Sequence, residues 1–130
     1  MVIVDTSVWI DYFNGVITPQ TNTLDVLLGM EEILVGDLIL TEVLQGFRQE
    51  RDFQRALRLF QAFRVVTMLG PELAIRSAQH YRTLRHRGVT VRKTIDMIIG
   101  TYCIEHKVSL LYVDRDFAPI VRHLGLQTVL

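Results

Sequence analysis

The chain begins with Met1-Val2-Ile3-Val4-Asp5-Thr6-Ser7, and this stretch indicates the architecture of the whole domain. Three branched aliphatic residues before any turn signal predict a strand buried on both faces, which is typical of a parallel sheet. Asp5 stands at the carboxyl end of that strand, where open α/β sheets bind their ligands. Asp5 is therefore a candidate for chemistry. From this stretch alone, an ordinary turn residue followed by Thr6 or Ser7 as a helix cap is an equal alternative.

Later apolar runs alternate with segments of helical spacing, and Asp37 and Thr94 stand where they are expected to cap helices. Strands are predicted at residues 33–36, 65–67 and 109–113, with a last edge strand at 126–130. Strands that alternate with helices predict an α/β fold with a mainly parallel sheet and right-handed crossovers. A length of 130 residues fits a single domain covering residues 1–130.

The composition is that of a globular protein, with 49% hydrophobic and 22% charged residues, which excludes a disordered chain. Cys103 is the only cysteine, so it supports neither an internal disulfide nor a cysteine zinc site, and a core position is expected. Trp9 lies at helical spacing from other apolar residues and is also predicted to be in the core or an interface. No secretory leader and no apolar run of membrane-spanning length are found, so we expect a cytoplasmic protein without membrane contact.

Charge is divided unevenly along a chain whose net charge is zero. Residues 1–47 hold seven acids and no Lys or Arg, whereas residues 48–93 hold eleven bases against three acids. Such a division suggests a basic middle that could hold a polyanion near an acidic centre. One predicted helix carries four arginines at helical spacing, Arg48, Arg51, Arg55 and Arg58. The arginine fork suits phosphate, but a solvated helix face explains such a stripe equally well.

Two acids share one local pattern, because Asp5 and Asp114 each follow an apolar strand directly. Parallel strands that end in this way bring their acids to the same edge of a sheet. Asp96, in the first turn of a helix, and Glu42, on another helix, could pack near that edge. Carboxylates gathered within about 4 Å repel by roughly 4 kcal/mol per pair at an effective dielectric of 20. Such a site needs a cation or raised pKa values, and oxygen ligands favour Mg²⁺ or Mn²⁺.

Four motifs in order along the chain resemble the PIN-domain ribonucleases, and among them the VapC-type toxins of bacterial and archaeal toxin–antitoxin pairs. The matching stretches are Val4-Asp5-Thr6-Ser7-Val8-Trp9-Ile10, Thr41-Glu42-Val43-Leu44-Gln45-Gly46, Thr94-Ile95-Asp96 with Ile98-Ile99-Gly100, and Val113-Asp114-Arg115-Asp116-Phe117. One motif alone would be weak. All four together span nearly the whole chain and are specific.

The resemblance implies a three-layer α/β/α fold and a metal-dependent endoribonuclease in which a metal-activated water hydrolyses the RNA phosphodiester bond. It also implies one or two Mg²⁺ or Mn²⁺ ions in each active site, a homodimer and a VapB-type antitoxin that inserts near the site. The implied catalytic acids and metal ligands are Asp5, Glu42, Asp96 and Asp114, with Asp116 as an accessory ligand and Thr6 or Ser7 contacting a water or the phosphate. The basic residues expected to hold RNA phosphates are the arginine stripe with Arg85, Arg87, Arg92 and Lys93.

Two other functions fit parts of the sequence. An aspartate-based phosphatase would use Asp5 as a nucleophile, but such enzymes place a second acid two residues later, where this chain has Ser7. A non-catalytic PIN-like protein would keep the fold and bind RNA or a partner through its basic middle. That protein would gain no stability from a divalent ion.

Overall fold

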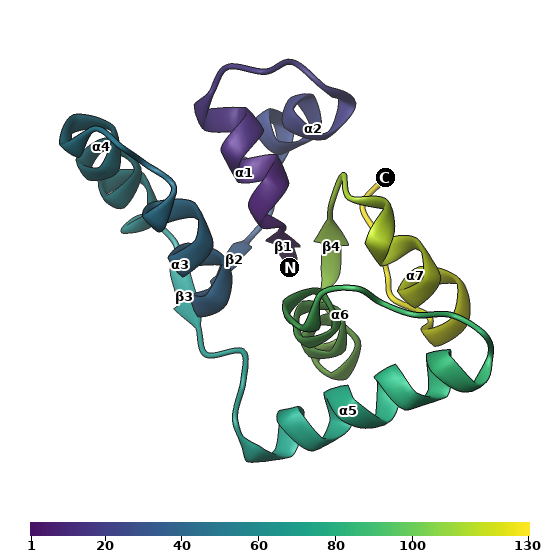
Figure 1. Ribbon diagram of the computed structural model, residues 1–130. Helices are drawn as coiled ribbons and strands as arrows, with labels where there is room; N and C mark the ends of the chain where they lie inside the picture. Colours follow the sequence, from purple (N-terminus) through teal and green to yellow (C-terminus); the bar gives the residue numbers. More distant parts are fainter.

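A computed structural model describes residues 1–130, and its centre is a sheet of four parallel strands in the order β3-β2-β1-β4 (Figure 1). The strands are β1 (Val2–Val4), β2 (Ile33–Gly36), β3 (Arg64–Val66) and β4 (Ser109–Leu111). In the register, Ile3 lies opposite Leu34 on one side and Leu110 on the other. The expected mainly parallel sheet is confirmed, with the first strand of the chain in its interior.

Seven α-helices and one 3₁₀ helix connect and cover the strands. They are α1 (Thr6–Phe13), α2 (Pro19–Leu27), α3 (Asp37–Gln45), α4 (Glu50–Phe60), α5 (Pro71–His86), α6 (Thr94–His106), the 3₁₀ helix η1 (Arg115–Phe117) and α7 (Ala118–Leu124). None of these helices combines the length and the apolar character that crossing a lipid bilayer requires.

Two helical layers follow from the strand order, because right-handed crossovers place helices according to the direction of each step across the sheet. The steps from β1 to β2 and from β2 to β3 run one way, and α1 to α4 pack together on one face. The return from β3 to β4 runs the other way, and α5, α6 and α7 pack against one another on the opposite face (Figure 1). The expected three-layer α/β/α architecture is thus confirmed.

The core is continuous from one helical layer through the sheet to the other. All three residues of β1 are buried, as the opening run of aliphatic residues predicted. Trp9 is fully buried in an aromatic cluster, stacked on Phe13 and edge-on to Phe60 of α4. Cys103 is buried on the other side of the sheet, in α6. The predictions that Trp9 and Cys103 are core residues are therefore confirmed.

Three local predictions were wrong. The edge strand expected at residues 126–130 is only a single bridge, between Leu110 and Thr128, because α7 extends to Leu124 and leaves little chain to pair. Thr94 is the first residue of α6, and Lys93 stands at its N-cap without a side-chain cap bond. Asp37 likewise lies inside α3, after an N-cap at Gly36. Its Oδ1 accepts hydrogen bonds from the backbone N–H groups of Leu38 and Met68, which ties the start of α3 to the segment after β3.

Candidate active site

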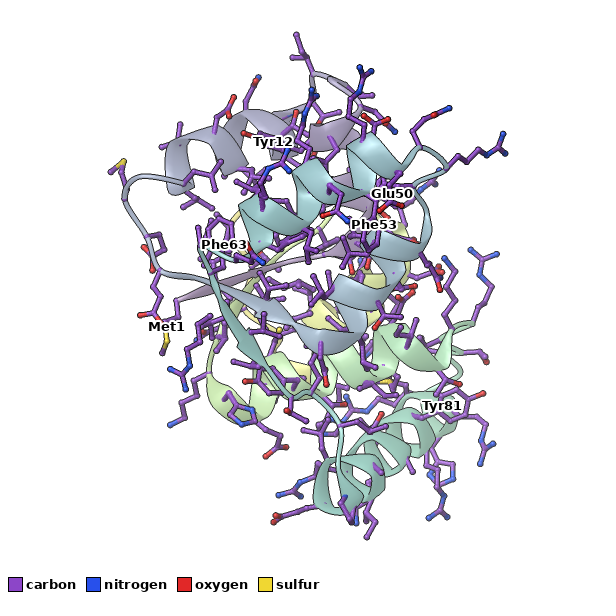
Figure 2. All side chains as sticks on the ribbon, turned by 90° about the vertical axis from the view of Figure 1, so that its left-hand side faces the viewer. Met1, Tyr12, Glu50, Phe53, Phe63 and Tyr81 are labelled. Atoms are coloured by element: carbon purple, nitrogen blue, oxygen red, sulfur yellow. The ribbon has the colours of Figure 1, made fainter.

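The acidic residues converge at the carboxyl edge of the sheet. Asp5 follows β1 directly, and its backbone N–H donates to the carbonyl of Leu111, the last residue of β4, at 2.9 Å. The ends of these two neighbouring strands are therefore joined, and Asp114 lies three residues past that point. Figure 2 shows Met1, which precedes β1, on the opposite side of the molecule from Glu50 and Tyr81. The start of α4 and the last part of α5 thus lie on the same side as this edge.

Asp5 is 4% exposed and begins the turn into α1. Burial raises the pKa of its carboxyl group to about 7, because a charged carboxylate loses hydration there. The backbone N–H groups of Thr6 and Ser7 oppose this rise in pKa, whereas the negative charges of Asp96 and Glu42 add to it. Asp5 is therefore close enough to both acids for their charges to matter.

Asp96 comes from the opposite helical layer, in the first turn of α6, where the helix dipole favours negative charge. It is 6% exposed, and its Oδ2 is buried without a hydrogen-bond partner. Burial raises the pKa of Asp96 to about 6, while nearby Lys93 lowers it and Asp114, Asp116 and Glu42 raise it further. An unpaired, buried carboxylate oxygen is costly and needs a cation or a proton.

Asp114 and Asp116 complete the group on the loop after β4. The backbone N–H of Asp116 donates to Oδ1 of Asp114 at 2.9 Å, so the side chain of Asp114 caps η1. One carboxylate oxygen from each of Asp96, Asp114 and Asp116 lies within 4.8 Å of the other two. We call these three residues the acidic cluster.

Glu42 reaches the same region from α3 through Thr6. The Thr6 hydroxyl donates to Oε1 of Glu42 at 2.6 Å, across 36 positions of sequence. This bond orients Glu42 next to Asp5. Asp5 makes no side-chain cap bond to α1, but the nearby backbone N–H of Ser7 lowers the pKa of its carboxyl group.

The acidic cluster suits a hard divalent cation. Its three ligating side chains are all carboxylates, which is the donor type that Mg²⁺ and Mn²⁺ prefer. The unpaired Oδ2 of Asp96 is an acceptor that the protein itself leaves unsatisfied. A bound cation would satisfy this oxygen and offset the repulsion between carboxylates, which adds to the effect of burial on the pKa values of Asp5 and Asp96.

The basic residues named from the sequence divide into two groups. The four arginines from Arg48 to Arg58 are all exposed, but only Arg51, Arg55 and Arg58 lie on α4, because the helix begins at Glu50 and leaves Arg48 in the preceding loop. The other group already has contacts within the chain, since Arg85 lies over the Tyr81 ring and Arg87 donates to the carbonyl of His123.

Arg92 and Lys93, which the sequence predicted only as RNA-phosphate contacts, form ion pairs with the acidic cluster that the sequence did not reveal. The available signal was their position directly before Thr94-Ile95-Asp96. That position puts both cations one turn from an acid.

Fold and site together define a class of protein. It is a three-layer α/β/α domain in which the ends of parallel strands and the first turn of helix α6 bring carboxylates together at one edge of the sheet. The family model of the PIN domain matches residues 2–122. The chain therefore belongs to the PIN-domain family.

Sequence relatives are found among the VapC ribonucleases. The chain is 30% identical to VapC ribonuclease Mb1587 of Mycobacterium bovis over 132 aligned positions, covering 98% of this chain and 96% of the relative. Ribonuclease VapC11 of Mycobacterium tuberculosis matches with the same identity and coverage.

Solved structures share the fold at lower sequence identity. VapBC2 from Rickettsia felis, bound to a DNA fragment from its promoter, matches with a TM-score of 0.77 and 16% identity over 98% of this chain and 97% of that chain. FitAcB from Neisseria gonorrhoeae matches with a TM-score of 0.72 and 14% identity over 98% and 96%. A toxin–antitoxin complex from Klebsiella pneumoniae gives a TM-score of 0.71 and 21% identity, over 91% of each chain.

Proposed function

We propose that this protein is a VapC-type endoribonuclease, the toxin of a toxin–antitoxin pair. The observation that carries the proposal is the acidic cluster at the carboxyl edge of the sheet, with Asp5 and Glu42 beside it. The similarity to VapC ribonucleases over 98% of the chain supports RNA as the substrate. The aspartate-phosphatase alternative is less favourable, because Ser7 stands where such enzymes place their second acid.

The cofactor in this proposal is Mg²⁺ or Mn²⁺, as one or two ions in each active site. Asp96, Asp114 and Asp116 would hold an ion, and Asp5 and Glu42 would complete its surroundings. A bound divalent ion makes water a better nucleophile near neutral pH and offsets the negative charge that develops on the phosphate. The protein contributes the fixed placement of the carboxylates. They follow or lie on β1, β4 and α6, whose residues are largely buried in the core.

Thr6 and Ser7 have positioning roles in this proposal. The Thr6 hydroxyl fixes the carboxylate of Glu42, while the backbone N–H groups of Thr6 and Ser7 favour the charged form of Asp5. Both effects keep negative charge available at the edge, where a cation is to bind.

The RNA backbone is proposed to run across this edge. Arg92 and Lys93 form ion pairs with the acids themselves. The start of α4 at Glu50 and the later part of α5 at Tyr81 lie on the side of this edge (Figure 2), so the arginine stripe and Arg85 and Arg87 are proposed to extend the RNA path on either side of it. A further proposal is an antitoxin partner, which the toxin–antitoxin complexes among the structural relatives support. The homodimer is also proposed, and it rests on the family resemblance alone. The cytoplasmic location stays a prediction.

The test is cleavage of total RNA by the purified, antitoxin-free protein with Mn²⁺, followed by mapping of the cut ends. We expect Asp5→Asn and Asp96→Asn each to reduce cleavage at least 100-fold, because each removes a charge that the cation needs. Glu32→Gln, at an exposed acid remote from the edge, is the matched control and should keep full activity. Cleavage that survives both aspartate changes would contradict the assignment, and a trapped phospho-enzyme would favour the phosphatase.

A further inference from the structure

Two basic side chains, Arg92 and Lys93, form ion pairs with the acidic cluster. Nη2 of Arg92 lies 3.2 Å from Oδ1 and 3.4 Å from Oδ2 of Asp116. Nζ of Lys93 lies 3.6 Å from Oδ2 of Asp114. The other oxygen of Asp114, Oδ1, already accepts the backbone N–H of Asp116. Lys93 therefore covers the oxygen of Asp114 that is left for a metal ion.

The loop that carries these cations is anchored on both sides. Val91 is 4% exposed, and Lys93 is the N-cap residue of α6. The backbone of this segment is thus held beside the cluster. The side chains are not held in the same way, since that of Arg92 is 79% exposed and that of Lys93 is 60% exposed. Long side chains with exposed ends on a fixed backbone can exchange one partner for another at little cost.

The acidic cluster keeps an excess of negative charge even with Arg92 and Lys93 beside it. The acidic cluster carries three negative charges when ionised, and Arg92 and Lys93 supply two positive ones. Arg92 pairs with Asp116 and Lys93 with Asp114, whereas Oδ2 of Asp96 is affected by the charge of Lys93 but has no hydrogen-bond partner. A divalent ion that binds all three carboxylates would compete with the two side chains for the oxygens of Asp114 and Asp116 and would repel their positive charges.

We propose that Arg92 and Lys93 are exchangeable counter-ions that couple metal binding to RNA binding. Without a metal ion they neutralise Asp114 and Asp116. When a divalent ion takes those carboxylates, the two side chains are released at the rim of the site and bind the RNA phosphates next to the scissile bond. This inference rests on the proposed function, because it assumes that the acidic cluster is the metal site.

The coupling gives Lys93→Gln opposite effects on two affinities. A single and a double positive charge at roughly 6 Å in water repel by the equivalent of about a tenfold change in affinity. We therefore expect Lys93→Gln to bind Mn²⁺ about tenfold more tightly than the parent protein, measured by isothermal titration calorimetry. It should also bind a short 2′-O-methyl oligoribonucleotide several-fold more weakly, but only when Mn²⁺ is present. Without metal, Lys93 is held by Asp114 and contributes little to RNA binding.

Three further proteins complete the experiment. Arg92→Gln should behave as Lys93→Gln does, and Lys93→Arg should restore both affinities because it keeps the charge. Lys107→Gln is the matched control, because Lys107 caps the other end of α6, about 20 Å away at 1.5 Å per residue. It should leave both affinities unchanged. Fluorescence anisotropy of the labelled oligonucleotide gives the RNA affinity, and gel electrophoresis afterwards checks that it is intact.

Each outcome decides the inference. An unchanged Mn²⁺ affinity in Lys93→Gln and Arg92→Gln, in a parent protein that binds Mn²⁺ and cleaves RNA, overturns the counter-ion exchange and leaves the proposed function standing. An equal loss of RNA affinity with and without Mn²⁺ overturns it as well, since Lys93 would then be a fixed phosphate contact. A parent protein that binds no Mn²⁺ overturns both this inference and the metal site of the proposed function.

Discussion

At the residue scale, two carboxyl groups of the site are buried, which makes their charged forms unfavourable. Asp5 and Asp96 are 4% and 6% exposed, and burial raises their pKa values to about 7 and about 6. A stable protein rarely leaves acids in this condition without a purpose, because perturbed pKa values concentrate at functional sites. The unpaired Oδ2 of Asp96 points to the same conclusion.

This arrangement predicts how the stability of the metal-free protein depends on pH. The folded protein binds more protons than the unfolded chain between about pH 4 and pH 7, since the pKa of Asp5 rises from 3.8 to about 7 on folding. Asp5 alone should therefore lower the free energy of unfolding by about 2 to 3 kcal/mol as pH rises from 5 to 8, and the raised pKa of Asp96 acts in the same direction. Urea unfolding at several pH values, in the presence of a chelator, measures this decrease in the free energy of unfolding.

Asp5→Asn tests whether this carboxyl group is the cause. The variant has no group to titrate at that position, so its free energy of unfolding should decline much less over the same pH range. Glu32→Gln should decline as the parent protein does, because Glu32 is exposed. Equal slopes for the parent protein and Asp5→Asn would show that Asp5 is charged in the folded state throughout.

At the element scale, α6 and α4 have different tasks. Helix α6 is buried around most of its surface, packs between the sheet and α5, and carries Asp96 in its first turn. Helix α4 has one apolar face, on which Ala56 and Phe60 are buried and Phe60 packs against Trp9 of α1, and its other face carries the exposed Arg51, Arg55 and Arg58. The structure gives these arginines no ion pair within the chain. Their charge is thus available for a partner.

The arginine stripe should contribute to the salt dependence of RNA binding. Removing one phosphate contact lowers the slope of log affinity against log salt by about 0.7 for a single strand. We expect the double variant Arg51→Gln, Arg55→Gln to lower this slope by about 1.4, measured by anisotropy at several salt concentrations. Arg122→Gln, on α7 in the other helical layer, is the control and should not change the slope. An unchanged slope in the double variant would identify the stripe as a solvated helix face.

At the scale of the whole molecule, the site is assembled from both halves of the chain. Asp5 and Glu42 come from the acidic first third of the chain, whereas Asp96, Asp114 and Asp116 come from the last third. The basic segment of residues 48–93 lies between them in the sequence and supplies Arg92 and Lys93 beside the acids. The parallel sheet makes this possible, because β1 and β4 are neighbours although more than a hundred residues separate them. Local unfolding of either half of the chain would therefore separate the acidic side chains from one another.

Metal binding should consequently stabilise the whole fold. A divalent ion that binds only the folded protein adds about 2.7 kcal/mol to the free energy of unfolding at 100 times its dissociation constant. We expect this gain with Mn²⁺ or Mg²⁺ in urea unfolding experiments at about pH 7.5. Asp114→Asn should lose most of it, and Glu32→Gln should keep it. A parent protein that gains no stability would favour the non-catalytic binding protein.

The amino-acid sequence by itself determined the strands, the alternation with helices and the two acids that follow strands. These features are local, since a run such as Val2-Ile3-Val4 and the acid next to it are encoded by neighbouring positions. The arginine stripe could likewise be identified from spacing, whereas Asp96, Glu42 and Asp116 entered the predicted site through the family resemblance. The acidic cluster was thus predictable as a set of residues.

Only the tertiary structure decided how these residues meet. It joined Thr6 to Glu42, left Oδ2 of Asp96 unpaired, and set Arg92 and Lys93 on Asp116 and Asp114. It also reduced the expected last strand to one bridge. The physical reason is that each of these contacts links segments some 20 or more positions apart or depends on burial. Such contacts are fixed by the packing of the two helical layers on the sheet and not by neighbouring residues in the chain.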